Sequence, residues 1–285
     1  MKRGELRIRT GAFLGALALF IAASGTQAQP AKARQEFVPQ VGQPGKDVIW
    51  VPTPDAVVKR MLEMAKVGPK DYVVDLGSGD GRTVIAAARD FGATALGVEF
   101  NPKMVELSRQ AAAQAGVSKR AQFRRGDIFA TDFSRATVVT MYLLPDVNLR
   151  LRPRLLDMRP GTRIVSHSFK MDEWQPDLSD EVEGHGIYFW IVPAKVDGNW
   201  SLRQPGRSMD ISLTQKFQKV RGTARSGQDS TELRDVTLSG DRISFSLDNS
   251  DGSRSHYTGS VLSASMQGNV STEGQPPVQW TASRR

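Results

Sequence analysis

Between residues 71 and 168 short apolar runs alternate with amphipathic segments, and this alternation restricts the fold more than any other feature of the sequence. Strands are predicted at 71–76, 94–99, 121–125, 136–143 and 162–168, and helices at 82–91, 102–115 and 146–157. Short buried strands separated by helices indicate a parallel sheet with helices on both faces. The apolar run 186–193 predicts one more strand, consistent with a late hairpin at the sheet edge. We therefore expect a doubly wound α/β sheet.

A further helix is predicted before the first strand. Thr53 can cap it, Pro54 suits its first turn, and Gly68 with Pro69 ends it. Its apolar positions fall on one face, at Val57, Val58, Met61, Leu62 and Ala65.

The pattern changes after about residue 195. Helical periodicity disappears, and short strands follow one another between turns rich in Gly, Asp, Asn and Ser, within 209–217, 231–240, 241–249, 255–261 and 265–270. This pattern predicts a small antiparallel all-β domain, a barrel or curved meander, with Trp200 opening it and Trp280 closing it.

The N-terminus resembles a secretory signal peptide, because a basic start is followed by an apolar run and then by small residues before a cut after Ala28. An uncleaved membrane anchor is the alternative, although the run is shorter than the roughly 20 residues of a spanning helix. We expect a signal peptide (1–28), a linker (29–49), the α/β domain (50–196) and the β-strand domain (197–285). The expected location is the periplasm or the outer side of the inner membrane.

Composition narrows the functional classes. The chain has no cysteine and only three histidines, so thiolate catalysis is excluded and a metal site is not expected. The first ten residues supply +3 of the net charge of +8, and no block of like charges follows, so no nucleic-acid partner is expected.

The stretch VVDLGSGDGR follows a predicted strand and opens a predicted helix. Glycines at 77, 79 and 81 allow a sharp turn and a close approach of a ligand to the helix N-terminus, which favours a carboxylate or a phosphate. The dinucleotide pattern G-x-G-x-x-G fails because Arg82 holds the last position, and the Lys-Ser/Thr of a phosphate-binding loop is missing. Asp75, just before the glycines, can bind a positively charged group.

S-adenosylmethionine carries both charges in its amino-acid end. Glu99, at the end of the second strand, can accept hydrogen bonds from both ribose hydroxyls, and Asp127 after the third strand can bind the adenine amine. Phe100 or Ile128 can cover the adenine ring, and Thr53 is a further cofactor-binding candidate, compatible with its role as a cap. These side chains all belong to one edge of the expected sheet, where ligands bind in open α/β folds.

Residues 73–127 resemble motifs I to III of the class I, seven-stranded S-adenosylmethionine-dependent methyltransferases, which have a Rossmann-like sheet. WVPTPDAVVKRMLEMAKV, GVEFNPKMVELSR and ATVVTMYLLP narrow the resemblance to the small family that methylates lysines on adenine-nucleotide translocase and the ATP synthase c-subunit. The resemblance covers about residues 50–170 and implies a protein substrate.

Methyl transfer from a sulfonium needs alignment more than acid–base groups. A lysine amine must nevertheless lose a proton, and Tyr142 and His167 are the candidate catalytic residues. The alternative to an enzyme is an exported methyltransferase-fold binding or scaffold protein without turnover, because S-adenosylmethionine is made in the cytoplasm. Association with a membrane or envelope partner through the N-terminus or the β domain is open, and the sequence leaves the oligomeric state unknown.

Overall fold

The structure is a computed structural model that describes residues 1, 4 and 37–285. The predicted signal peptide, apart from Met1 and Gly4, and residues 29–36 of the predicted linker lie outside the described residues.

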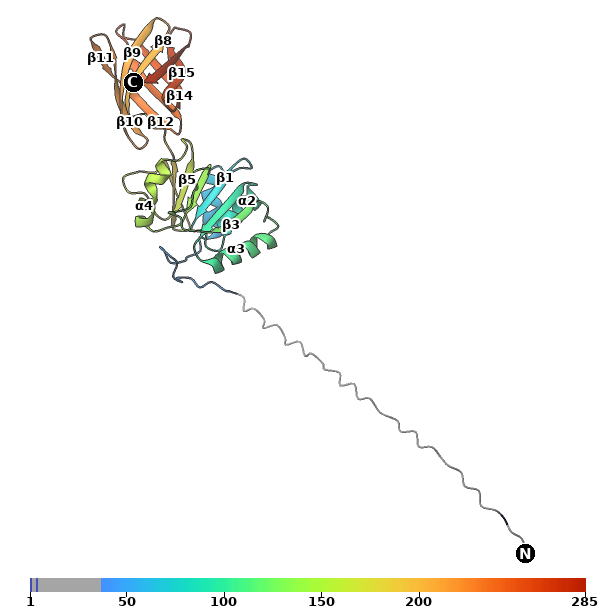
Figure 1. The fold of residues 1–285 in the computed structure, drawn as a ribbon. Coiled ribbons are helices and arrows are strands. Elements are labelled where there is room, and N and C mark those ends of the chain that lie inside the picture. Colours follow the sequence, from blue (N-terminus) through green and yellow to red (C-terminus); the bar gives the residue numbers. More distant parts are fainter. Residues whose placement is uncertain (2–3, 5–36) are drawn as a thin grey trace. The chain divides into compact units, whose positions relative to one another are not determined.

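The first part of the chain forms a seven-stranded sheet with helices on both faces (Figure 1). Its elements are α1 (Asp55–Met64), β1 (Tyr72–Leu76), α2 (Arg82–Asp90), β2 (Thr94–Glu99), α3 (Pro102–Gln114), β3 (Ala121–Arg125), β4 (Val138–Met141), α4 (Pro145–Leu156), β5 (Arg163–His167), β6 (Leu178–Val182) and β7 (His185–Ile191). The strand order is β3-β2-β1-β4-β5-β7-β6, and the first five strands are parallel. The predicted edge hairpin is present as β6 and β7, both antiparallel to their neighbours.

The apolar periods of the helices explain how they cover this sheet. The predicted face of α1 is buried, with Met61 and Leu62 almost fully inaccessible to solvent, and it packs in one core with α2 and α3. A separate core on the other face of the sheet contains α4, through Leu151 and Leu155, and Trp190 of β7. The sheet is therefore a buried layer whose central strands β1 and β4 are fixed from both sides.

The rest of the chain forms a nine-stranded antiparallel sheet that curves into a nearly closed barrel (Figure 1). Its strands are β8 (Gly198–Gln204), β9 (Arg207–Lys216), β10 (Lys219–Ser226), β11 (Asp229–Glu232), β12 (Arg234–Ser239), β13 (Arg242–Asp248), β14 (Arg254–Leu262), β15 (Ser265–Thr272) and β16 (Val278–Arg284). The first strand, β8, pairs with the last, β16, and both Trp200 and Trp280 are buried in the barrel core, which agrees with the predicted architecture.

Two local predictions were wrong. The segment 231–240, predicted as one strand, is divided at Leu233 into β11 and β12, which are the two opposite edges of the sheet. The Leu233 amide donates to the Gly222 carbonyl of β10, so the gap between the edges is bridged there. Thr53 does not cap α1, because Pro54 is the N-cap residue and no side chain accepts a hydrogen bond at this end. Among the described helices, none has the length and apolar character needed to cross a membrane.

The turn between β9 and β10 contacts the segment that follows β5. Phe217 stacks on the fully buried Trp174, with ring centroids 6.1 Å apart, and the Arg152 guanidinium of α4 lies 5.6 Å from the same ring. Lys216 forms a 3.0 Å ion pair with Glu173, the residue beside Trp174. The barrel therefore supports the loop that continues from the end of β5.

Replacement of Phe217 by alanine tests this support. We expect Phe217→Ala to lower the free energy of unfolding by about 1–2 kcal/mol, because a half-buried aromatic contact and its stacking are lost. Urea unfolding followed by tryptophan fluorescence measures the change. Leu262→Ala, at an exposed position of β14, is the matched control and should stay within about 0.5 kcal/mol of the wild type. Equal stability of Phe217→Ala and Leu262→Ala would contradict the proposed support.

Candidate functional site

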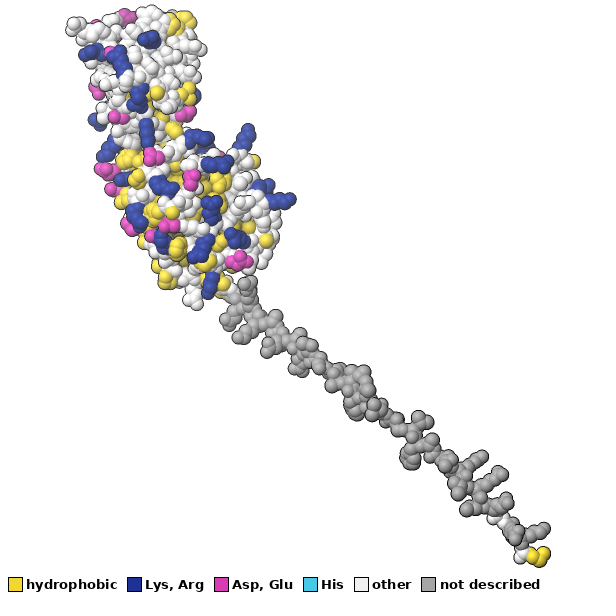
Figure 2. All heavy atoms as spheres, viewed as in Figure 1, with side chains coloured by type: hydrophobic (Ala, Val, Ile, Leu, Met, Phe, Trp, Pro, Cys, Tyr) yellow, Lys and Arg dark blue, Asp and Glu magenta, His cyan; other side chains and the backbone are white. Residues whose placement is uncertain are grey.

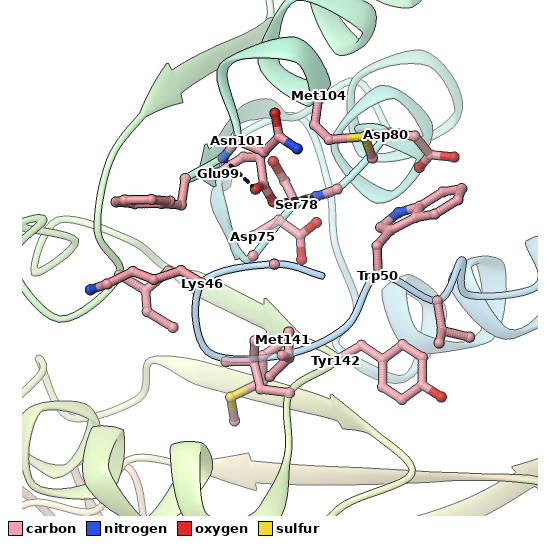
Figure 3. A pocket seen from close by; sticks show the side chains of 18 of the residues that line it. Lys46, Trp50, Asp75, Ser78, Asp80, Glu99, Asn101, Met104, Met141 and Tyr142 are labelled. Carbon is pink, nitrogen blue, oxygen red and sulfur yellow. Dashed lines mark hydrogen bonds between the residues drawn. The ribbon is translucent and has the colours of Figure 1, made fainter. Parts of the chain in front are cut away.

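A pocket opens at the carboxyl ends of the strands, where the chain order reverses between β1 and β4. It extends from there to the end of β2. Ligands bind at this point in open α/β sheets because the carboxyl ends of the strands and their loops diverge there. The residues that line the pocket come from the loops after β1, β2, β3 and β4 and from the segment before α1. Among them are Lys46, Trp50, Thr53, Asp75, Gly77, Ser78, Gly79, Asp80, Glu99, Phe100, Asn101, Met104, Asp127, Ile128, Met141 and Tyr142 (Figure 3).

Asp75 is the most unusual ionisable group of the pocket. Its side chain is almost completely buried at the end of β1, and one carboxylate oxygen accepts a 2.6 Å hydrogen bond from the Thr140 hydroxyl of β4. Burial raises the pKa of Asp75 to about 7, the Thr140 hydrogen bond opposes this increase, and the charges of Asp80 and Glu99 add to it. A buried carboxylate is stabilised by a nearby cation. No salt bridge joins Asp75 to a lysine or arginine of the described chain, so a cationic ligand can supply that charge.

The three glycines of the loop after β1 have different surroundings. All three have positive φ angles, of 78° at Gly77, 53° at Gly79 and 82° at Gly81, a region that favours glycine. Gly77 and Gly79 line the pocket, but Gly81 does not. Gly81 is the N-cap residue of α2, and a Cβ there would lie 2.6 Å from the ring of Phe123. The structure therefore places two of the predicted cofactor-binding glycines at the pocket and the third in the packing behind it.

Glu99 connects the end of β2 to the glycine loop. One carboxylate oxygen accepts a 3.0 Å hydrogen bond from the Gly79 amide, and the other accepts a 2.8 Å bond from the Asn101 amide. Each oxygen keeps a second lone pair that can accept from a ligand hydroxyl. Within residues 37–285 no three His, Asp or Glu side chains come together in a way that could hold a metal ion.

Asp127 lines the pocket and already forms an ion pair with a lysine of the same chain. The Lys46 ammonium donates a 2.6 Å hydrogen bond to one carboxylate oxygen, and the Phe129 amide donates a 2.8 Å bond to the other. The Lys46 hydrogen bond, followed by that of Phe129, lowers the pKa of Asp127 below its usual range. Lys46 also lies 5.4 Å from the ring centroid of Phe100, which is exposed, whereas Ile128 is buried.

The segment 40–50, of which residues 40–49 belong to the predicted linker, forms an ordered loop at the pocket. The Gly42 amide bonds to the Trp50 carbonyl and the Trp50 amide bonds to the Gln43 carbonyl, so the loop folds back on itself. The Trp50 indole covers Gly79, where a Cβ would lie only 2.6 Å from the indole nitrogen. In the view of Figure 3, Trp50 and Lys46 lie on this loop, with Asp75 and Glu99 on one side and Met141 and Tyr142 on the other.

The two predicted catalytic residues are in contact. The ring of Tyr142, at the end of β4, lies over the ring of His167, at the end of β5, with centroids 3.9 Å apart. Tyr142 lines the pocket, whereas His167 is fully buried behind it. Thr53 lines the pocket, and its hydroxyl lies 3.2 Å from Nδ1 of His167. Thr53 thus links His167 to the pocket instead of capping α1.

Sequence reasoning missed several residues of the site, including the following four. Lys46 belongs to the stretch 29–49, which lacks periodicity, and Trp50 follows it directly, although the pattern WVPTP that begins at Trp50 could have indicated that residue. Thr140 is one polar residue inside an apolar strand, and its partner Asp75 was identified without it. Ser78 is buried, and its hydroxyl has no hydrogen-bond partner in the described chain. That hydroxyl lies against Gly97 of β2, in the packing behind the pocket.

These features fit the amino-acid and nucleoside groups of S-adenosylmethionine. Asp75 offers a buried negative charge for an ammonium, the loop after β1 offers the amides that begin α2, and Glu99 retains free lone pairs for hydroxyls. Met141 and Leu143 supply apolar walls. The residues present therefore suit this cofactor, and they are the ones that would hold it.

Comparison with known proteins identifies related chains. The ANTKMT methyltransferase domain matches residues 75–178. A protein-lysine N-methyltransferase from Saccharolobus islandicus is 45% identical over 151 residues, which are 51% of this chain and 94% of the relative. The human lysine N-methyltransferase of the ATP synthase c-subunit is 34% identical over 139 residues, which are 48% of this chain and 58% of that protein.

One solved structure is similar both in sequence and in fold. It is an RNA methyltransferase from Salinibacter ruber in complex with S-adenosyl-L-homocysteine, 51% identical, with a TM-score of 0.51. The match covers 51% of this chain and 96% of that one.

Binding of the cofactor at Asp75 predicts an affinity that depends on pH. The pKa of Asp75 is about 7, and a bound ammonium favours the ionised carboxylate, so binding near pH 6 must expel a proton. The dissociation constant of S-adenosyl-L-homocysteine should therefore be about tenfold larger near pH 6 than near pH 8. Calorimetry in buffers of different ionisation enthalpy measures both the affinity and the released proton. An affinity that is independent of pH, without proton release, would refute this role.

Asp75→Asn is the matched control for this experiment. It should bind more weakly and without the pH dependence. The pKa of Asp75 in the folded chain exceeds its ordinary value of 3.8, so the ionised carboxylate opposes folding, and this cost is fully present above pH 7. Asparagine removes it, and the variant should melt at a higher temperature than the wild type near pH 8.

Proposed function

The chain belongs to the ANTKMT family of S-adenosylmethionine-dependent methyltransferases, and from this we propose that it methylates a lysine amine of a protein. The buried Asp75 beside the glycine loop carries the cofactor assignment, because it is a negative charge in need of a cation at the ligand-binding point of the sheet. The relatives from Saccharolobus islandicus and human, both named as lysine methyltransferases, favour a protein-lysine substrate.

When bound, the cofactor supplies a methyl group on a sulfonium, which is already activated for displacement. The residues of the chain hold, align and shield the reactants. Asp75 would bind the ammonium of the cofactor and Glu99 its ribose hydroxyls, while Ile128 supplies an apolar surface for the adenine. The loop 40–50 forms one side of this part of the pocket.

An RNA substrate is the second candidate, because the similar enzyme from Salinibacter ruber is described as an RNA methyltransferase. The charge distribution does not favour it. On the face shown in Figure 2, lysine and arginine side chains are interspersed with acidic ones and form no continuous basic surface. A binding site for nucleic acid normally gathers positive charge along one face.

Transfer of labelled methyl groups distinguishes the two substrates. The full chain is incubated with S-adenosylmethionine carrying a tritiated methyl group and, separately, with a bacterial envelope extract, a soluble protein extract and total RNA. We expect label in protein, on lysine side chains identified by mass spectrometry, and no label with Asp75→Ala. Label in RNA alone would replace the lysine assignment, and no label in any fraction would reject it.

We also propose that the protein is exported, on the basis of the basic, apolar and small-residue sequence of positions 1–28. Cell fractionation with N-terminal sequencing should find a mature chain that begins near Gln29 in the periplasm or on the outer side of the inner membrane. An intact Met1 in the outer-side membrane fraction would indicate an uncleaved anchor. A full-length cytosolic protein would contradict export.

A further inference from the structure

Three polar side chains form a row that leads from the pocket wall to the surface. Thr53 lines the pocket, and its hydroxyl lies 3.2 Å from Nδ1 of His167. Nε2 of His167 lies 3.0 Å from Nδ1 of His185. His167 is fully buried, whereas His185 is half-buried and follows an exposed turn at Glu183 and Gly184. Both ring nitrogens of the buried histidine therefore have a partner, one toward the pocket and one toward solvent.

The pairing of β5 with β7 fixes this row. His167 pairs directly with Ile187, and His185 lies two residues before Ile187 on the same face of β7. A diagonal position of this kind keeps two long side chains within reach of each other. The Tyr142 ring lies against one face of the His167 ring, with centroids 3.9 Å apart. The order of the three groups thus follows from the register and from packing.

His167 is suited to pass a proton rather than to hold one. Burial, together with the charge of His185, lowers the pKa of His167 to about 4, so its ring is neutral near pH 7. A neutral imidazole has one N–H donor and one acceptor nitrogen. It can therefore receive a proton at one nitrogen while it releases another from the opposite side.

A lysine substrate creates a need for such a path. Its amine has a reference pKa of about 10.4 and arrives mainly as an ammonium, which cannot attack the methyl group. The proton must therefore leave the amine, and Thr53 is one of the polar residues of the pocket wall.

We propose that Thr53, His167 and His185 form a proton exit path from the substrate amine to solvent, an inference that rests on the lysine-methyltransferase function proposed above. The ammonium gives a proton to Oγ1 of Thr53, whose own proton passes to Nδ1 of His167. The Nε2 proton of His167 passes to Nδ1 of His185, and the Nε2 proton of His185 passes to water. One proton enters the row and one leaves it, so the row carries no net charge afterwards. Both imidazoles are left in the opposite tautomer, and rotation of the rings must restore the first one before the next turnover. His167 and His185 act through Thr53 and are positioning residues.

The resting tautomers test the path without any methyl acceptor. The full chain has three histidines, so nitrogen NMR of 15N-histidine-labelled protein can be assigned with His185→Gln and His256→Gln. We expect His167 to be neutral near pH 7 and protonated at Nε2, with Nδ1 accepting from Thr53, and the Nδ1 shift should change in Thr53→Val. Protonation of His167 at Nδ1 in the resting protein would overturn the proposed direction.

Rates of methyl transfer test the use of the path. The acceptor is the protein extract that takes up the label in the experiment above, and S-adenosylmethionine is saturating. Under these conditions the rate of methyl transfer by His185→Gln and by Thr53→Val should be lower by about 10- to 100-fold. Their solvent deuterium isotope effect should increase, because proton departure becomes rate-limiting. Thr53→Ser, which keeps the hydroxyl, should retain most of the rate. His256→Gln is the matched control, because the His256 ring bonds to Ser246 in the barrel. Its rate of methyl transfer should equal that of the wild type.

The outcomes separate this proposal from the function on which it rests. Wild-type rates in His185→Gln, or equal rates in Thr53→Val and Thr53→Ser, would refute the exit path while leaving lysine methylation intact. If the wild type transfers no methyl group to either protein extract, the proposed function fails. The tautomer of His167 then still decides whether the row can conduct a proton outward. Calorimetric affinity for S-adenosyl-L-homocysteine should be the same in His185→Gln and His256→Gln as in the wild type.

Discussion

The carboxylate of Asp75, buried at the carboxyl end of the central strand β1, is the constraint on which the site depends. It pairs in register with Gly97 of β2 on one side and with Thr140 of β4 on the other, and only the second offers it a side-chain hydrogen bond. A buried charge without a cation opposes folding. The ionised Asp75 carboxylate therefore lowers the stability of the folded chain, and a cationic ligand bound beside it would remove this cost.

The segment before α1 explains part of the glycine loop by packing against it. Glycine at 79 makes room for the Trp50 indole, and glycine at 81 makes room for Phe123, so two of the three glycines serve packing between elements of the chain. Lys46 from the same segment pairs with Asp127, which the sequence assigns to the adenine amine. An adenine must therefore share Asp127 with Lys46 or displace it. The loop 40–50 is thus part of the site, although its residues 40–49 lie in the predicted linker.

Much of the fold could be predicted because its elements have strong local patterns. The five parallel strands, the helices between them and the edge hairpin follow the observed order, and the resemblance to the seven-stranded methyltransferases is confirmed. Strand β6, with the sequence LSDEV, was missed because an edge strand carries polar residues and lacks alternation. The break at Leu233 was missed because β11 and β12 read as one continuous strand, although they belong to opposite edges of the barrel.

The sequence by itself determined the class of fold and the chemistry of the cofactor pocket. Strand and helix periods, glycine positions and acids at strand ends are local signals, and the parallel sheet brings the strand ends to one edge. The tertiary structure alone decided which groups touch. Thr53, His167 and His185 are far apart in the chain, and only the packing of α1 and the register of β5 with β7 align them. Such contacts depend on distances between elements, which no local pattern encodes.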